Sequence, residues 1–189
     1  VKQMGLTIEE VDKLSGPVIG RPKSATFRTV DLVGLDTLVH VANGIRENCP
    51  GDERLELFEL PDFINTMMDN KWLGSKTGQG FYKKTKDSKG TTEILSLDLN
   101  TLEYRAAQKG KFATLEDTKS IDNVADRFKV LVNGKDKAGT FYRKTLAALF
   151  GYVTHRIPEI ADELYKIDDA MKAGFGWQHG PFQIWDAIG

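Results

Sequence analysis

Cysteine is almost missing from this sequence, and long hydrophobic runs are missing altogether. Cys49 is the single cysteine among 189 residues, so an internal disulfide is excluded and a reducing compartment is expected. No apolar run approaches the roughly 18 residues that cross a bilayer, and the first residues show no signal-peptide pattern. We therefore expect a cytoplasmic protein.

An excess of charge of either sign is also missing. Lysine and arginine number 26 against 27 acidic residues, which gives a net charge of −1. A nucleic acid or an anionic membrane surface is therefore an unexpected partner. With 40% hydrophobic and 28% charged residues, the composition is that of an ordinary globular protein.

Motifs for cofactor or metal chemistry are absent as well. No G-x-G-x-x-G lies between a strand pattern and a helix pattern, and GQGFY (78–82) leads into a predicted strand instead of a helix. His40, His155 and His179 stand singly, without H-x-x-x-H or C-x-x-C spacing. We predict no catalytic residue, no cofactor-binding residue and no metal ligand in this chain.

Helical patterns dominate the first part of the chain. Thr7 and Glu10 form a capping box before a helix over IEEVDKL, which ends at Gly16-Pro17. From Ala25 to Ile45, apolar residues recur at three- and four-residue intervals and predict a buried helix bent at Gly34. A further helix, FINTMMDN, is predicted to begin at Pro61.

The second part combines a hairpin with more helices. Phe81-Tyr82, a DSKG turn, and alternating Leu95, Leu97 and Leu99 predict a small β-hairpin. Helical pattern resumes with Thr114 as a cap, and two helices, a glycine-rich loop and a last helix starting at Pro181 follow. The prediction is a mainly α fold in three segments: a first helical unit (1–85), a hairpin and linker (86–113), and a second helical unit (114–189).

Comparison of the chain with itself reveals a repeat. VDKLSGPVIGRPKSATFRTVDLVG (11–34) aligns with IDDAMKAGFGWQHGPFQIWDAIG (167–189) with one gap in the loop. Four pairs of positions are shared: Asp12 with Asp168, Phe27 with Phe182, Asp31 with Asp186, and Gly34 with Gly189. We predict two related units of helix, glycine loop and helix, in which the aspartates cap helices or interact with helix dipoles.

Three motifs carry a resemblance to a known family. VDKLSGPVIGRPKSATFRTVDLVGLD, WLGSKTGQGFY and IDDAMKAGFGWQHGPFQIWDAIG occur in family order, and together with the rest of the chain they resemble the helical C-terminal domain of 3-hydroxyacyl-CoA dehydrogenases. The likeness is to the large bacterial and archaeal members, often fused to an enoyl-CoA hydratase. It implies a fold like the C-terminal domain of 6-phosphogluconate dehydrogenase.

The resemblance also implies a function. Family members oxidise the 3-hydroxyl of an L-3-hydroxyacyl-CoA with NAD in fatty-acid β-oxidation, and a histidine oriented by a glutamate removes the hydroxyl proton. Both residues and the NAD loop belong to a Rossmann domain that we do not find in this sequence. The chain begins at Val1 and ends after FQIWDAIG, so we expect a fragment truncated at both ends and inactive by itself. Tyr142 stands where a family asparagine would lie, and it is given no catalytic role.

The implied site residues belong to the substrate side. In the family the loop equivalent to GRPKSATF packs near the acyl thioester, which makes Pro22, Lys23, Ser24, Ala25 and Phe27 the expected lining. The sequence has P-K-S-A-T-F where single-function enzymes have P-M-G-P-F. Implied partners are an acyl-CoA, the Rossmann domain, an enoyl-CoA hydratase domain and a second helical unit, in a homodimer or a pseudo-dimer. The alternative is a non-catalytic helical module for protein assembly.

Overall fold

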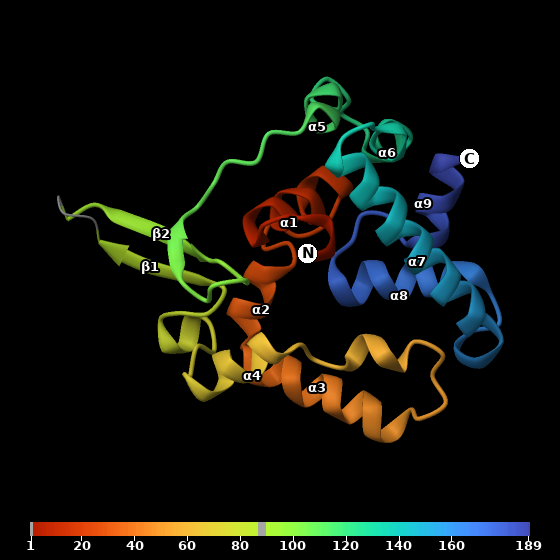
Figure 1. Cartoon of the computed structure of the whole chain (residues 1–189). Coiled ribbons are helices and arrows are strands. Elements are labelled where there is room, and N and C mark those ends of the chain that lie inside the picture. The colour runs from red at the N-terminus through yellow and green to blue at the C-terminus, as the bar shows by residue number, and fades with distance from the viewer. Residues whose placement is uncertain (1, 87–89) are drawn as a thin grey trace. The chain divides into compact units, whose positions relative to one another are not determined.

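A computed structural model gives the structure of residues 2–86 and 90–189, and the elements are drawn in Figure 1. Its contacts group the described residues into two compact units, 1–12 with 26–109, and 13–25 with 110–189. The division falls inside the first helix, α1 (Ile8–Ser15). The contacts group the β-strands with the first unit, and the three predicted segments remain a prediction about domains.

The first unit is built from helices α1 to α4 and a small sheet. The predicted capping box is present, since the Thr7 N–H donates to Glu10 Oε2 at 2.9 Å and the Glu10 N–H donates to Thr7 Oγ1 at 3.3 Å. The long helix expected from Ala25 is in fact two helices, α2 (Phe27–Val33) and α3 (Leu35–Asn48). Gly34 has φ 111° between them, a conformation in which the helix ladder cannot continue.

The other helix of the first unit is α4 (Asp62–Asp69), for which Pro61 is the N-cap and not the first helical residue. Short 3₁₀ turns cover Lys2–Met4, Leu55–Phe58 and Ser75–Thr77. The core of this unit consists of apolar residues from α1, α3 and α4, from β2 and from the segments next to β1 and β2: Ile8, Leu35, Ile64, Met67, Phe81, Leu97 and Leu99.

The predicted hairpin is part of a three-stranded antiparallel sheet. Strands β1 (Tyr82–Lys86), β2 (Thr92–Leu97) and β3 (Tyr104–Ala106) lie in the order β1-β2-β3. Tyr82 pairs with Ser96, and Leu97 pairs with Tyr104. Residues 87–89 of the predicted DSKG turn lie outside the described residues. The sequence prediction missed β3 because a three-residue strand is too short to show alternation.

The second unit contains the short turn Pro17–Ile19 and helices α5 (Ala113–Asp117), α6 (Val124–Asn133), α7 (Lys137–Ile160), α8 (Leu164–Phe175) and α9 (Pro181–Ile188). Helix α6 packs on α7, α9 and the 17–19 turn. The helices predicted at the end of the chain are confirmed, including Pro181 as a helix start. The predicted cap Thr114 is instead inside α5, and Asn123 caps α6 with its side chain. No helix in the described part of the chain is long and apolar enough to cross a membrane.

Candidate functional site

The loop predicted to line a substrate forms a tight turn in the second unit. Pro22 and Lys23 are exposed, and Ser24 and Ala25 are partly buried. The Ala25 N–H donates to the Pro22 carbonyl at 2.9 Å, and Ala25 has φ 52°, which a non-glycine residue adopts infrequently. The structure therefore gathers these four residues in one turn. Their role toward a substrate remains a prediction.

Phe27, the fifth predicted residue, is the first residue of α2 and belongs to the first unit. Its ring packs against Phe81 with centroids 4.7 Å apart, at the edge of the hydrophobic core. Its side chain therefore contributes to packing in its own unit, a role equally compatible with its helical spacing.

A partly buried carboxylate, that of Asp12, holds the start of α2. Its oxygens accept hydrogen bonds from the N–H groups of Thr26 at 3.0 Å, Phe27 at 2.6 Å and Arg28 at 3.0 Å. The Tyr82 hydroxyl donates to the same carboxylate at 2.7 Å. Burial raises the pKa of Asp12 despite these four donors. The residue lies in α1 and caps the next helix across the intervening loop.

A second carboxylate of this unit, Asp31 on α2, holds the beginning of β1. It accepts the N–H groups of Phe81 and Tyr82, both at 2.8 Å. A Cβ on Gly80 would lie 2.1 Å from Asp31 Oδ1, so only glycine fits this approach. Burial raises the pKa of Asp31. Since its oxygens bind backbone donors, Asp31 has a structural role and is not placed as a general base.

Tyr82 connects the two carboxylates, through its hydroxyl to Asp12 and through its N–H to Asp31. Burial and the neighbouring Asp12 charge raise the pKa of the Tyr82 phenol, so the proton stays on this donor at neutral pH. Beside it lies a pocket of about 210 Å³. Its lining residues are Arg28, Asp31, Ser75, Gly78, Tyr82, Lys84 and Ile94.

The GQGFY segment does not fit a dinucleotide. Gly80 is placed against Asp31, a negative group that would repel a pyrophosphate, and the segment continues into β1. The described residues therefore supply no place for NAD here. Among residues 2–86 and 90–189, no group of three His, Cys, Asp or Glu side chains is arranged to hold a metal ion.

The second unit repeats the first carboxylate arrangement. Asp168, in α8, accepts the N–H groups of Phe182 at 2.8 Å and Gln183 at 3.1 Å in the first turn of α9. Gly180 permits this approach, because a Cβ there would lie 2.3 Å from the Asp168 Cα. In both copies of the predicted repeat, an aspartate thus accepts N–H groups from the start of the helix that follows the loop. The counterpart of Asp31, Asp186, is exposed.

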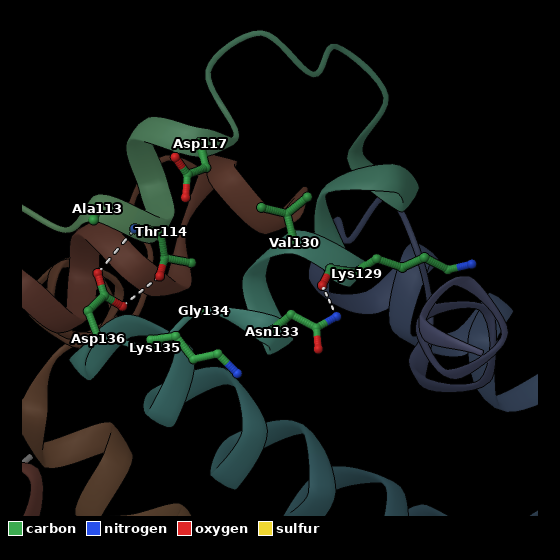
Figure 2. A pocket seen from close by; sticks show the side chains of 9 residues that line it. All are labelled: Ala113, Thr114, Asp117, Lys129, Val130, Asn133, Gly134, Lys135 and Asp136. Atoms are coloured by element: carbon green, nitrogen blue, oxygen red, sulfur yellow. Dashed lines mark hydrogen bonds between the residues drawn. The ribbon is translucent and has the colours of Figure 1, made fainter.

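A pocket of about 750 Å³ lies between α5, α6 and the start of α7 in the second unit (Figure 2). Asp136 on its wall accepts the Thr114 N–H at 3.1 Å and the Thr114 hydroxyl at 2.6 Å, and it caps α7 through the Gly139 N–H at 3.1 Å. Burial opposes ionisation, but these hydrogen bonds outweigh it and hold the pKa of Asp136 below its usual value. Figure 2 shows the side chains of Lys129 and Lys135 extending at the rim. The residues that line this open pocket include no nucleophile paired with a base.

Two further residues stand out in the second unit that sequence reasoning gave no role. Tyr142 is only 1% exposed, and its hydroxyl donates to the Leu14 carbonyl at 2.8 Å, which explains why a tyrosine stands here. Arg21 lies with its guanidinium 3.7 Å from the centre of the Trp177 ring. Its position in GRPKS was visible in the sequence, but the aromatic partner is more than a hundred residues away and no periodicity connects the two.

Comparison with known proteins shows what the chain is similar to. Residues 1–84 match the model of the 3-hydroxyacyl-CoA dehydrogenase C-terminal domain. A protein of Bacillus subtilis (strain 168) named probable 3-hydroxyacyl-CoA dehydrogenase is 46% identical over 98% of this chain and 23% of its own length. The chain is related to the C-terminal region of 3-hydroxyacyl-CoA dehydrogenases. The resemblance found in the sequence is thereby confirmed.

Two further relatives extend the comparison. A probable 3-hydroxyacyl-CoA dehydrogenase of Deinococcus radiodurans is 51% identical over 47% of the chain and 25% of its own length. A putative fatty acid oxidation complex trifunctional enzyme of Rickettsia felis is 23% identical over 92% of the chain and 23% of its own length. The chain thus spans about a quarter of the length of these curated relatives. No solved structure matches it.

Proposed function

We propose that this chain is the substrate-side part of an NAD-dependent L-3-hydroxyacyl-CoA dehydrogenase of fatty-acid β-oxidation. The observation that carries the proposal is the 46% identity to the Bacillus subtilis protein over 98% of the chain. The fatty-acid context is supported by the name of the Rickettsia felis relative, a putative fatty acid oxidation complex trifunctional enzyme. A cytoplasmic location belongs to the same proposal.

In this proposal the turn of Pro22, Lys23, Ser24 and Ala25, together with Phe27, lines the acyl-thioester end of the substrate. NAD and the catalytic histidine belong to a Rossmann domain elsewhere in the parent protein, as the family resemblance implies. Within GQGFY, Gly80 packs against Asp31. An enoyl-CoA hydratase domain is a further proposed part of that protein. The isolated chain is therefore expected to bind substrate without oxidising it.

Association through helices is the second element of the proposal. Three apolar side chains of α2 and α3 are exposed in the first unit, namely Leu32 at 60%, Val33 at 57% and Val41 at 50%. Exposed apolar side chains favour burial against another helical unit, in a homodimer or a pseudo-dimer. This observation is also the one that favours the alternative, a helical assembly module without a catalytic role.

Calorimetry of the isolated chain with acetoacetyl-CoA and, separately, with NADH tests the proposal. Saturable heat with the CoA ester and none with NADH is the expected result. The same chain with Ser24→Trp, which fills the turn with a large side chain, should lose the heat while keeping its melting temperature. NADH oxidation by the isolated chain would contradict the proposal. The absence of binding heat with both ligands would favour the assembly module.

A further inference from the structure

Arg21 is a cation to which the structure gives no anionic partner. Its Nε is buried and has no hydrogen-bond acceptor among the described residues. The electrostatic neighbour that acts on it is Tyr142, a neutral group at ordinary pH, and no carboxylate is found beside it in the described ranges 2–86 and 90–189. Burial lowers the pKa of Arg21 to about 10, which leaves the guanidinium charged at neutral pH.

The surroundings of Arg21 hold the guanidinium plane in place. The ring of Trp177 lies 3.7 Å from the Arg21 Cζ, a cation–π stack that covers the face of the group. The backbone is fixed on both sides, because the Arg21 N–H donates to the Gly16 carbonyl at 3.2 Å and the Gln178 N–H donates to the Gly20 carbonyl at 2.8 Å. These contacts restrict the conformations of the Arg21 side chain and so limit the other groups that its guanidinium can reach.

The Arg21 guanidinium lacks a hydrogen-bond acceptor among the described residues. Arg21 as a residue is partly exposed although its Nε is buried, and its two Nη groups donate to no described residue. On the facing segment, the buried Nδ1 of His179 also has no partner among the described residues. A guanidinium with one face against an aromatic ring and nitrogens without a protein acceptor can bind a planar pair of oxyanion oxygens.

Gly20 allows the two loops around Arg21 to pack closely. Gly20 has φ 68°, and a Cβ on it would lie 2.9 Å from the Gln178 Cβ and 3.1 Å from a Val124 methyl. The two loop segments, 20–22 and 176–179, are therefore in direct contact. A guanidinium without a carboxylate partner among the described residues can gain hydrogen-bond acceptors from a ligand anion, so the contact between these loops marks a candidate anion site.

We propose that Arg21, supported by Trp177, binds a phosphate oxyanion. Two sources share this chemistry: free phosphate or pyrophosphate, and the phosphate groups of a CoA ester. The proposal rests on the contacts of Arg21 and not on the proposed dehydrogenase function, which assigned no role to this residue. It therefore survives or fails independently of the substrate.

The test uses the whole chain labelled with ¹⁵N, at constant ionic strength. Pyrophosphate, acetoacetyl-CoA and acetate are titrated separately, and the Arg21 Nε–Hε signal is followed after assignment by its loss in Arg21→Lys. We expect a saturable shift with pyrophosphate and an affinity at least tenfold lower in Arg21→Lys, measured by calorimetry. The matched control is Arg46→Lys, since Arg46 is exposed in α3, and it should leave the affinity unchanged.

The titrations distinguish free phosphate or pyrophosphate from the phosphate groups of a CoA ester. A shift with pyrophosphate and with the CoA ester supports phosphate as the shared group, a shift with the ester alone assigns the site to CoA, and a shift with pyrophosphate alone assigns it to free phosphate. No saturable shift with either overturns the proposal, as does tighter binding of acetate than of pyrophosphate. Because the wild-type protein gives these results, poor folding of a variant does not weaken the test.

Discussion

Asp12 and Asp168 perform the same task in the two units. Each lies four residues after the first residue of its helix, Ile8 in α1 and Leu164 in α8, and each accepts N–H groups from the first turn of the helix beyond the next loop. A carboxylate at that place satisfies donors that a helix start leaves unpaired and interacts favourably with the helix dipole. The two copies of the internal repeat therefore share one structural device, an aspartate before the loop that binds the start of the helix after the loop.

Removing the Asp168 carboxylate should destabilise the second unit. Asp168→Ala leaves the N–H groups of Phe182 and Gln183 without their acceptor, and we expect the free energy of unfolding to fall by about 1–2 kcal/mol. Chemical denaturation followed by circular dichroism measures the change. The neighbouring Asp169→Ala, which removes an exposed carboxylate paired with Lys172, is the control and should have a smaller effect. Equal losses in both variants would rule out the capping role.

Asp31 should show a graded response to substitution. Asp31→Ala leaves the N–H groups of Phe81 and Tyr82 unsatisfied, and the expected loss of unfolding free energy is about 3 kcal/mol. Asp31→Asn keeps one acceptor oxygen and should lose about half as much. Urea denaturation of both variants gives the comparison, with the exposed Asp69→Asn as control. A full loss in Asp31→Asn would mean that charge, and not the acceptor, matters.

Two glycine-to-alanine changes in the second unit should have opposite signs. Gly180→Ala places a methyl against Asp168, where a Cβ has only 2.3 Å to the nearest backbone atom, and should cost about 1–3 kcal/mol. Gly174→Ala lies in α8 with no atom within 4 Å of the added Cβ, and should stabilise by up to about 1 kcal/mol. Thermal unfolding of both proteins is the measurement. A stable Gly180→Ala variant would contradict the close packing.

Tyr142 should give the protein a specific sensitivity to alkali. Burial raises the pKa of this phenol above its ordinary value of 10.0, so the folded protein keeps the proton that the unfolded chain releases. Its contribution to stability is complete below pH 10.0 and falls as the pH rises further. Tyr142→Phe should cost about 1 kcal/mol at neutral pH, through the lost hydrogen bond to Leu14, and should flatten the alkaline decline.

Unfolding free energies between neutral pH and pH about 11 test this expectation, since the unfolded phenol titrates near 10. Tyr165→Phe is the control, because that side chain is 56% exposed. An identical alkaline decline in wild type and Tyr142→Phe would show that other groups cause it.

Much of the fold followed from local signals in the sequence. The capping box of Thr7 and Glu10, the break at Gly34 and the helix start at Pro181 depend on residues close together in the chain, so the pattern suffices to find them. What the sequence did not reveal are contacts over long separations. Two such contacts are the hydrogen bond of the Tyr82 hydroxyl to Asp12 and the stack of Arg21 on Trp177. Both form only when distant segments pack, and the residue types alone do not indicate which residues will be in contact.

The candidate site shows the same limit. The turn of Pro22 to Ala25 was singled out through family resemblance, and its local geometry is clear from one hydrogen bond. The aspartates of the repeat were expected to be caps, and this is confirmed for Asp12 and Asp168. That they cap the following helix across a loop, rather than their own, was not predictable, because the pattern contains no information about which N–H groups a carboxylate will reach.

The carboxylate closure has a consequence for how such loops can change over time. Asp12 and Asp168 bind backbone N–H groups, which every residue except proline possesses, so closure makes few demands on the side chains in between. The segments GPVIGRPKSA and KAGFGWQHG indeed share little besides glycine, yet both are spanned by the same anchor. Because the aspartate hydrogen bonds do not depend on the loop side chains, the loop of one copy can acquire residues that bind a new ligand while the loop of the other copy keeps its own residues.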